Sequence, residues 1–434
     1  MAQLFTKKQS FSLLEKALDA TSLPYASAWA SSSHHVLTRF AADTLTQNVA
    51  RSHQSLSLDV AKGSKHGSAS TNKTSADSLK HLAHSAELAA RFAPKDPEYV
   101  LPTKAQPLEE PSSYSSCSTW LDPEQRAETA AKIIAMGRKK GLRVSGVVSM
   151  ARSSRSLKTS REFEGYQRSS EALCSVSMEG KSGSGWAEQV SFFPEKLHPM
   201  KVAEEAMTVC LQAQRPKEIP PGEYPVLFST QAVASLLAYL IWQMNAREAD
   251  EKRSCFTGKM GKKIGNTSVH LRSQPLHMET PGISFNGEGV PARDCSWIEG
   301  GVLKNLPYSR YWAKKKKVRN FTFPSNLIMD GGKGSLEDLV AGTDQALLVT
   351  RLWYIRMVEP MSLTLTGLTR DGTFWVEKGQ IKRPVRNLRF NDSPLRLLSL
   401  VGQMGTPCPV GAPIPAFLPP LLVKSFRFTS VATK

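Results

Sequence analysis

Three side chains that could ligate a metal ion occur at helical spacing in the N-terminal part of the sequence. His81, His84 and Glu87 lie three residues apart, so a helix would place them on neighbouring positions of one side, as in some metal sites. The surrounding residues have the pattern of an ordinary amphipathic helix, and these three side chains fall on its polar side. We therefore interpret them as solvent-facing residues and predict no metal there.

A second candidate is a basic cluster that follows several aromatic residues. It consists of Lys314, Lys315, Lys316, Lys317 and Arg319. Basic and aromatic side chains together are typical of proteins that bind single-stranded nucleic acid. The net charge of +18 permits such a partner. No RNP, KH, helix-turn-helix or zinc-finger pattern accompanies the cluster, so a solvated turn beside a strand is the preferred interpretation and nucleic-acid binding an alternative.

The residue spacings of other common functional motifs are absent from the sequence. The glycines at 258, 261 and 265 and the segment 331–335 match neither phosphate-binding pattern, and Ser335 with Asp338 reads instead as a helix N-cap. The six cysteines are isolated, which suggests a reducing compartment. The N-terminus has no signal-peptide pattern, and a cytoplasmic location is expected.

Length and composition predict a large globular protein. The chain has 434 residues, of which 40% are hydrophobic and 22% charged, so a disordered or collagen-like chain is excluded over most of the length. Residues 224–246 carry no charge and approach the length of a membrane span. Polar residues interrupt all but one side of the helix predicted from residue 230, so we expect a buried amphipathic helix and no membrane.

The elements expected to position these residues alternate between helices and strands in the first half of the chain. Helices are predicted at 10–20, 75–92, 122–140 and 199–214, and strands at 55–60, 144–150 and 172–178. Pro-rich joins at 102–118 and 215–222 suggest boundaries. We therefore predict an N-terminal α+β domain over 1–105, a central α+β domain over 106–216 and a C-terminal domain over 217–434.

The C-terminal domain is expected to be mostly β. Asp371-Gly372 predicts a type I′ hairpin between 362–370 and 373–377, and Lys378-Gly379 a second turn before Ile381. The fold class is therefore α+β: N-terminal units with mixed sheet and helices, then a predominantly antiparallel domain with one long buried helix.

Long ordered segments resemble a known family. They are residues 46–49, 67–72, 94–99, 288–293, 301–312, 326–332, 347–360 and 364–379. Together they resemble the TldD/PmbA family, also called modulators of DNA gyrase. The resemblance implies a cytoplasmic bacterial metallopeptidase system in which a TldD-like subunit pairs with a TldE/PmbA-like subunit. In the active subunit a His-Glu-x-x-x-His motif on a helix and a C-terminal cysteine hold zinc, which activates water for peptide hydrolysis.

This sequence departs from that motif. The matching positions hold Thr230, Gln231 and Ser235, and counting back from residues 409–411 puts the cysteine position on Val401. Hydroxyl groups are poor zinc ligands, and a carboxamide cannot act as a base at neutral pH. Cys408 is expected to pack as a small apolar group. We therefore expect a TldE/PmbA-like subunit with a degenerate site and no zinc cofactor.

Three functional hypotheses follow. In the first, the chain dimerises with a TldD-like paralogue, or with itself, and helps to enclose a chamber that admits unfolded peptides. In the second, the chain is an active zinc peptidase with other ligands, for which His270, His277, Glu279 and Cys295 are candidates. In the third, the basic surface binds nucleic acid, with strongly salt-dependent affinity.

Overall fold

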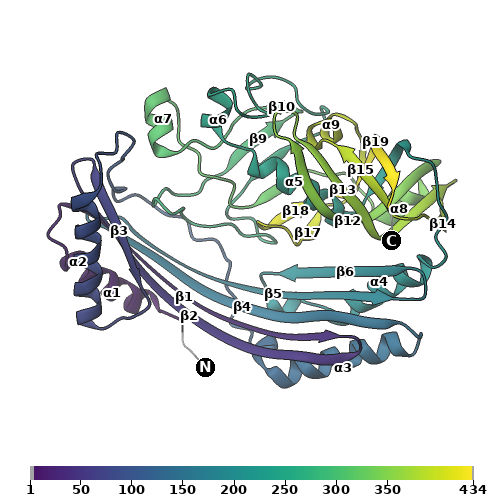
Figure 1. Cartoon of the computed structure of the whole chain (residues 1–434), viewed down its shortest axis with the longest axis horizontal. Coiled ribbons are helices and arrows are strands. Elements are labelled where there is room, and N and C mark those ends of the chain that lie inside the picture. Colours follow the sequence, from purple (N-terminus) through teal and green to yellow (C-terminus); the bar gives the residue numbers. More distant parts are fainter. Residues whose placement is uncertain (1–3, 433–434) are drawn as a thin grey trace.

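A long curved sheet formed by the N-terminal half of the chain dominates the architecture (Figure 1). The structure is a computed structural model and describes residues 4–432. The sheet has the strand order β3-β2-β1-β4-β5-β6, with every pair antiparallel. Its strands are β1 (Tyr25–Ala41), β2 (Thr44–Lys62), β3 (Lys65–Thr71), β4 (Arg143–Thr159), β5 (Glu164–Glu179) and β6 (Ser184–Ser191).

Helices cover the convex face of this sheet and confirm the helices predicted in this half. They are α1 (Lys7–Asp19), α2 (Ala76–Phe92), α3 (Pro123–Arg138) and α4 (Pro199–Gln212). Ser75 caps α2 by accepting a hydrogen bond from the N–H of Ser78. The strands extend well beyond the predicted segments. The predicted segments were too short because the outer parts of the strands are rich in serine and show little hydrophobic alternation.

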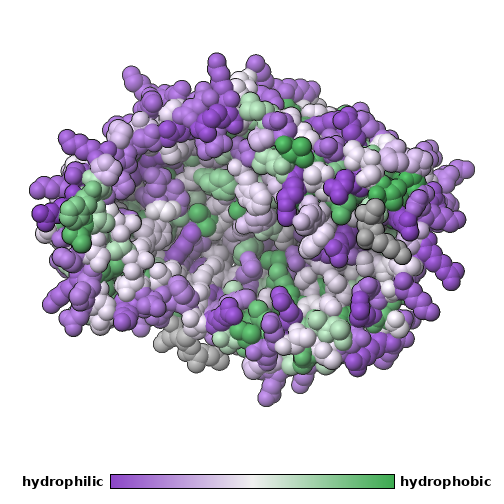
Figure 2. All heavy atoms as spheres, viewed as in Figure 1, coloured by the Kyte–Doolittle hydropathy of each residue, from purple (hydrophilic) through white to green (hydrophobic). Residues whose placement is uncertain are grey.

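The two faces of the long sheet differ in chemistry. On β1, Ala28, Val36 and Phe40 are buried beneath the helices. The alternate positions Ser31 and His35 point to the other face and are exposed. Small polar side chains bury little apolar surface, so nothing requires this concave face to be covered completely. The space-filling view shows a hollow on the corresponding side of the molecule (Figure 2).

The C-terminal half lies over the concave face of the long sheet and contains two further sheets (Figure 1). One has the order β10-β9-β8-β11-β18-β17, and the other has the order β12-β7-β19-β15-β13-β14 with β16 paired to β19. Most pairs are antiparallel; β7–β12 and β11–β18 are parallel. The predicted α+β class with a predominantly antiparallel C-terminal domain is confirmed.

The elements of this half are, in chain order, β7 (Gly222–Phe228), α5 (Thr230–Trp242), α6 (Ala246–Asp250), β8 (Leu271–Ser273), β9 (Cys295–Glu299), β10 (Val302–Leu303), α7 (Arg310–Lys316), β11 (Leu327–Met329), α8 (Leu336–Ala341), β12 (Gln345–Glu359), β13 (Thr364–Glu377), β14 (Gln380–Pro384), β15 (Leu388–Asp392), α9 (Pro394–Ser399), β16 (Val401–Met404), β17 (Cys408–Val410), β18 (Ala416–Leu418) and β19 (Leu421–Val431).

Helix α5 is the buried helix predicted from the sequence. It packs against β7 and β12 on one side and against β17 and β18 on the other. Val233, Leu237 and Leu240 are buried in the largest apolar core. The uncharged stretch 224–246 is therefore the end of β7 followed by this helix. Within residues 4–432 no helix is long and apolar enough to cross a membrane.

The hairpin predicted at Asp371-Gly372 is wrong. Strand β13 runs through both residues, and the register with β12 shifts there, between the pairs Val349–Thr373 and Arg351–Arg370. Asp371 and Gly372 have φ values of 53° and 124°, so the backbone forms a bulge instead of a turn. The bulge directs the Asp371 carboxylate into the interior, where only 5% of the residue is exposed.

Two other local predictions are confirmed. Lys378 and Gly379 both have positive φ and join β13 to β14, as a type I′ turn requires. Ser335 caps α8, where it and Asp338 form a reciprocal capping box.

The two units on either side of the predicted domain boundary at residue 105 contribute strands to the same long sheet. β1 from the first predicted unit pairs along its length with β4 from the second. The two units nevertheless have separate apolar clusters, one beneath α1 and α2 and the other beneath α3 and α4. The division into three domains stays a prediction.

Glu223 at the start of β7 is expected to make stability depend on acid pH. Its carboxylate accepts hydrogen bonds from Ser425 and Arg427 of β19 and pairs with Arg396 of α9. These hydrogen bonds, chiefly, lower its pKa from 4.5 to about 2. A lowered pKa in the folded state stabilises the protein above the unfolded pKa, and this stabilisation is lost as pH falls from about 4.5 toward about 2.

Urea unfolding at pH 6, 4 and 3 should therefore show a smaller acid-induced loss of stability for Glu223→Gln than for the unmodified protein. Glu218→Gln is a matched control. Glu218 also pairs with an arginine at the surface, and among the described residues it forms no second ion pair. Equal acid dependence of the unmodified protein and Glu223→Gln would contradict the assignment.

Candidate functional site

The N-terminus of α5 forms the centre of the candidate site. Ser229 caps the helix by accepting a hydrogen bond from the N–H of Ala232, and its hydroxyl donates to the carbonyl of Thr350 on β12. β7 enters the helix directly and is itself hydrogen-bonded to β12. The first turn of α5 is therefore held at a defined place beside β12.

The structure places Thr230 and Gln231 on this turn and Ser235 on the next turn, and each has a protein partner. The Gln231 side chain donates a hydrogen bond to the carbonyl of Gly411 at 3.1 Å. The Ser235 hydroxyl donates to the carbonyl of Gln231 one turn earlier, at 2.8 Å. The Thr230 hydroxyl lies 3.6 Å from the Cys408 sulfur. These contacts hold the three side chains in place. That they occupy the positions of the family's ligands and base stays a prediction.

Val401, the residue counted to the cysteine position, is 1% exposed and packs in the apolar core at the start of β16. Cys408, at the start of β17, is exposed, and its sulfur lies 3.6 Å from the Thr230 hydroxyl. The assignment of the cysteine position to Val401 stays a prediction.

The Cys408 thiol is not prepared to act as a thiolate. Loss of solvation beside α5 raises its pKa above the ordinary value of 9.0, and the charge of Glu205 adds to this effect, while the contact with Thr230 opposes it. The protonated thiol is a poor metal ligand and a poor nucleophile. The Cys408 side chain is therefore a neutral thiol beside Thr230.

A groove of about 470 Å³ runs from this turn along α5 and β12. Gln231 and Ser235 lie at one end, and aromatic side chains line the rest. These aromatic residues are Tyr239, Trp242, Trp353 and Tyr354. A register shift in β12, where Tyr354 has a φ of 54°, turns its side chain outward, and Arg356 stacks on it with 4.4 Å to the ring centroid. The groove can therefore make apolar and stacking contacts with an extended chain.

A second cavity, of about 360 Å³, lies on the other side of the loop at Gly411. Glu171 and Glu188, from β5 and β6, line it. Burial raises the pKa of both carboxyl groups, and for Glu188 the charge of Arg351 partly opposes this. The loop at 411–413 thus separates the aromatic groove from an acidic cleft on the long sheet.

The candidate ligands of the alternative peptidase hypothesis contact other protein groups or are buried. Glu279 pairs with Lys196 at 3.2 Å, and the His277 ring accepts a hydrogen bond from the N–H of Thr280. The Cys295 thiol is buried, which raises its pKa to about 12. His270 lies just before β8, where its ring is 3.4 Å from the N–H of Gly300.

Zinc does not fit the side chains that are present. No three His, Cys, Asp or Glu side chains of the described residues are grouped closely enough to hold a metal ion. At the α5 turn the donors are two hydroxyls, a carboxamide and one protonated thiol, which differ from the imidazole, carboxylate and thiolate ligands that zinc prefers. The geometry therefore favours neither the family's zinc position nor the alternative ligand set.

The basic cluster forms the end of a helix and not the predicted turn beside a strand. Lys314, Lys315 and Lys316 make up the last turn of α7, where positive charge stabilises the helix dipole. Lys315 lies over the Trp312 ring at 4.7 Å, and Lys316 pairs with Asp250. Lys317 ends the helix in a left-handed conformation, and Arg319 lies over Phe321 at 5.3 Å. These contacts account for part of the cluster, and nucleic-acid binding stays an alternative hypothesis.

Sequence reasoning did not find the aromatic groove or the acidic cleft. Trp353 and Tyr354 are neighbours in a strand, where consecutive side chains normally point to opposite faces. Only the irregular register of β12 brings both to the groove. Glu171 and Glu188 lie on two different strands, and the pairing register of β5 with β6 brings them to one cavity.

Comparison with known proteins places these features in context. Residues 221–430 match the PmbA/TldA metallopeptidase C-terminal domain. The chain is 24% identical over 203 residues to a zinc metalloprotease TldD homolog of Saccharolobus solfataricus, a match that covers 42% of this chain and 43% of that protein. It is 22% identical over 202 residues to a metalloprotease PmbA homolog of Haemophilus influenzae, with 45% and 44% covered. The chain thus spans less than half the length of these relatives.

The fold extends over nearly the whole chain. The crystal structure of TldE from Thermococcus kodakarensis is similar with a TM-score of 0.87 at 18% sequence identity, covering 98% of this chain and 99% of that chain. The long curved sheet and the C-terminal unit therefore form a known architecture.

Proposed function

Because the chain belongs to the TldD/PmbA family, we propose that it is a non-catalytic, TldE/PmbA-like subunit that binds unfolded peptides and pairs with a TldD-like peptidase or with itself. The observation that carries this proposal is the first turn of α5. The turn is capped, positioned beside β12 and open to a groove, yet Thr230, Gln231 and Ser235 provide neither zinc ligands nor a base.

Peptide binding is supported by the surfaces around that turn. The groove exposes the faces of Trp242, Trp353 and Tyr354, and the concave face of the long sheet is polar and partly open to solvent. An unfolded peptide has both apolar side chains and unpaired main-chain groups, so it can use both surfaces. No chemical step is assigned to this chain, because its side chains supply no activated nucleophile at the groove.

Pairing with a second subunit is supported by the exposed apolar end of the β12–β13 hairpin. Val358 and Met361 are 55% and 47% exposed there, close in sequence to the exposed Tyr354. Contiguous apolar surface of this kind is typical of protein–protein contacts. A partner seated on this end would also border the aromatic groove.

Copurification from the source cells tests the pairing. A tagged chain expressed at its natural level is expected to recover a TldD-like protein in stoichiometric amount, or to sediment alone as a dimer, because the apolar hairpin end favours a covered state. Recovered complexes should hydrolyse unfolded casein fragments, and the isolated chain should not.

A control variant separates pairing from folding. Met361→Lys and Val358→Lys place charges on the exposed hairpin end and should abolish recovery of the partner with no loss of thermal stability, while Lys382→Glu on β14 should leave recovery intact. A chain that sediments as a monomer and recovers no TldD-like protein would exclude the proposed pairing.

A further inference from the structure

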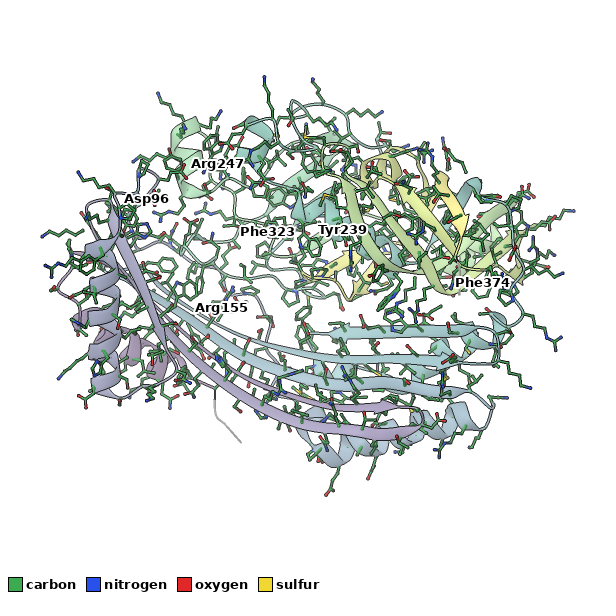
Figure 3. All side chains as sticks on the ribbon, in the orientation of Figure 1. Asp96, Arg155, Tyr239, Arg247, Phe323 and Phe374 are labelled. Atoms are coloured by element: carbon green, nitrogen blue, oxygen red, sulfur yellow. The ribbon has the colours of Figure 1, made fainter. Side chains whose placement is uncertain are left out.

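A separate cavity of about 270 Å³ lies between the loop after α7 and the segment before β9. It is distinct from the groove at α5, with which it shares no lining residue. Its walls include two guanidinium groups, two aromatic rings and several uncharged polar side chains. The residues on which the inference depends are Arg293, Arg319, Phe321 and Phe323. Phe323 lies where the C-terminal unit faces the long sheet (Figure 3).

The floor of the cavity is held rigidly by its own hydrogen bonds. The Trp297 indole donates to the hydroxyl of Ser273, which in turn donates to the carbonyl of Asn326. The Asn326 carboxamide donates to the carbonyls of Gln274 and Thr280. Because every one of these polar groups has a partner, the floor is a formed surface before any ligand arrives.

Asn320 and Ser325 add uncharged polar side chains to the lining. Their atoms Asn320 Oδ1 and Ser325 Oγ are themselves buried, so they lie behind the surface that a ligand would contact. The part of the wall that is open to a ligand therefore consists mainly of the two arginines and the aromatic rings.

The charge of the cavity is positive and unbalanced. Arg293 and Arg319 line it, and neither forms an ion pair within the part of the chain that the structure describes. The neighbouring Cys295 thiol, whose pKa burial raises to about 12, stays neutral and does not offset them. Planar guanidinium groups bind carboxylates and phosphates through paired hydrogen bonds.

We propose that this cavity binds the C-terminal residue of a peptide. Its carboxylate would bind Arg293 and Arg319, and its side chain would pack against Phe321 and Phe323. An inorganic phosphate matches the arginines, but it offers no apolar group to the two rings. A C-terminal residue supplies an anion and an apolar group together.

This inference deepens the proposed function, since it names the end of the peptide that the chain recognises. It does not depend on a partner subunit, because every lining residue belongs to this chain. The isolated protein therefore tests it. If the cavity did not bind the ligand, the pairing proposal would still stand and would be tested by copurification.

Calorimetric titration of the full chain with N-acetyl-phenylalanine and with N-acetyl-phenylalaninamide is the test. The acid should bind, and the amide should bind at least about tenfold more weakly because it lacks the carboxylate. Arg293→Gln and Arg319→Gln should each weaken the acid by about tenfold or more, and raised salt should do so as well.

Arg389→Gln is the matched control. Arg389 lies on β15 outside the cavity, is exposed, and forms no ion pair with any described residue. It should leave both affinities unchanged, and thermal unfolding should confirm that all variants are folded. Equal binding of acid and amide, unchanged binding in both arginine variants, or no binding of the acid would overturn the proposal. Phosphate binding without binding of the acid would also overturn it and would point to a phosphate group.

Discussion

Replacing Thr230, Gln231 and Ser235 together by His, Glu and His is expected to create a site that retains about one zinc ion per chain after dialysis. The unmodified protein should retain none under the same conditions. The substitutions restore two imidazole ligands and a carboxylate at the spacing of the family motif. Cys408 already lies beside Thr230, so a third ligand is at hand.

The physical reason for a large effect lies in the rigidity of the helix start. Ser229 fixes the first turn of α5 to β12, so the new ligands would be held in place without loss of much conformational entropy. Zinc binding would also lower the pKa of the Cys408 thiol, which desolvation now raises. Affinity should therefore rise by at least about a thousandfold, measured by mass spectrometry of metal content and by competition with a chelator.

Two further variants make this prediction specific. Gln231→Glu alone adds a carboxylate but no imidazole and should retain no zinc. The triple variant with Cys408→Ser should retain zinc much more weakly, whereas Cys117→Ser in the same background should have no effect, because Cys117 lies on the N-terminal connector. If the triple variant bound no zinc, the assignment of this turn to the family's site would be wrong. One zinc in the unmodified protein would instead support the peptidase hypothesis.

The second large effect is expected from Asp371→Ala, which should destabilise the folded protein by about 3–5 kcal/mol. The Asp371 carboxylate pairs with Arg351 at 2.6 Å and accepts a hydrogen bond from Ser184 on β6, also at 2.6 Å. Arg351 itself stacks on Trp186 of β6, 4.0 Å from the ring centroid. Removing the carboxylate would leave a largely buried guanidinium without its counterion, at the contact between the long sheet and β13.

Chemical unfolding in urea measures this effect, with the midpoint and slope compared between variants. Arg370→Ala is the control: Arg370 also approaches Asp371, at 3.7 Å, but its side chain is 49% exposed, so a change of at most about 1 kcal/mol is expected. Replacing both members of the buried pair by apolar residues, Arg351→Met with Asp371→Leu, should recover part of the loss. A loss below about 1 kcal/mol in Asp371→Ala would contradict this role.

Asp371 also illustrates how local sequence signals can mislead. Asp-Gly between two apolar alternating segments is a strong hairpin signal, because both residues tolerate positive φ. A bulge requires the same φ values, and pairing with β12 decided between the two outcomes. At Lys378-Gly379 the same signal did produce a turn, because no neighbouring strand continues beyond it.

The sequence by itself determined the helices of the first half and α5, the class of the fold and the family resemblance, and it predicts the loss of the zinc motif. These depend on residue types and on spacing within one element, such as the apolar stripe of α5 or Gln231 at the position of the base. The helix cap at Ser335 was equally readable, since a cap is formed by residues three apart.

Only the tertiary structure decided which distant residues meet. It placed Cys408 beside Thr230, turned Trp353 and Tyr354 into one groove, and assembled the cavity of Arg293 and Arg319. Each of these depends on strand register and loop path, which are set by the burial of whole faces across the molecule. A one-residue change of register moves a side chain to the opposite face of a sheet, so spacing along the chain cannot reveal such sites.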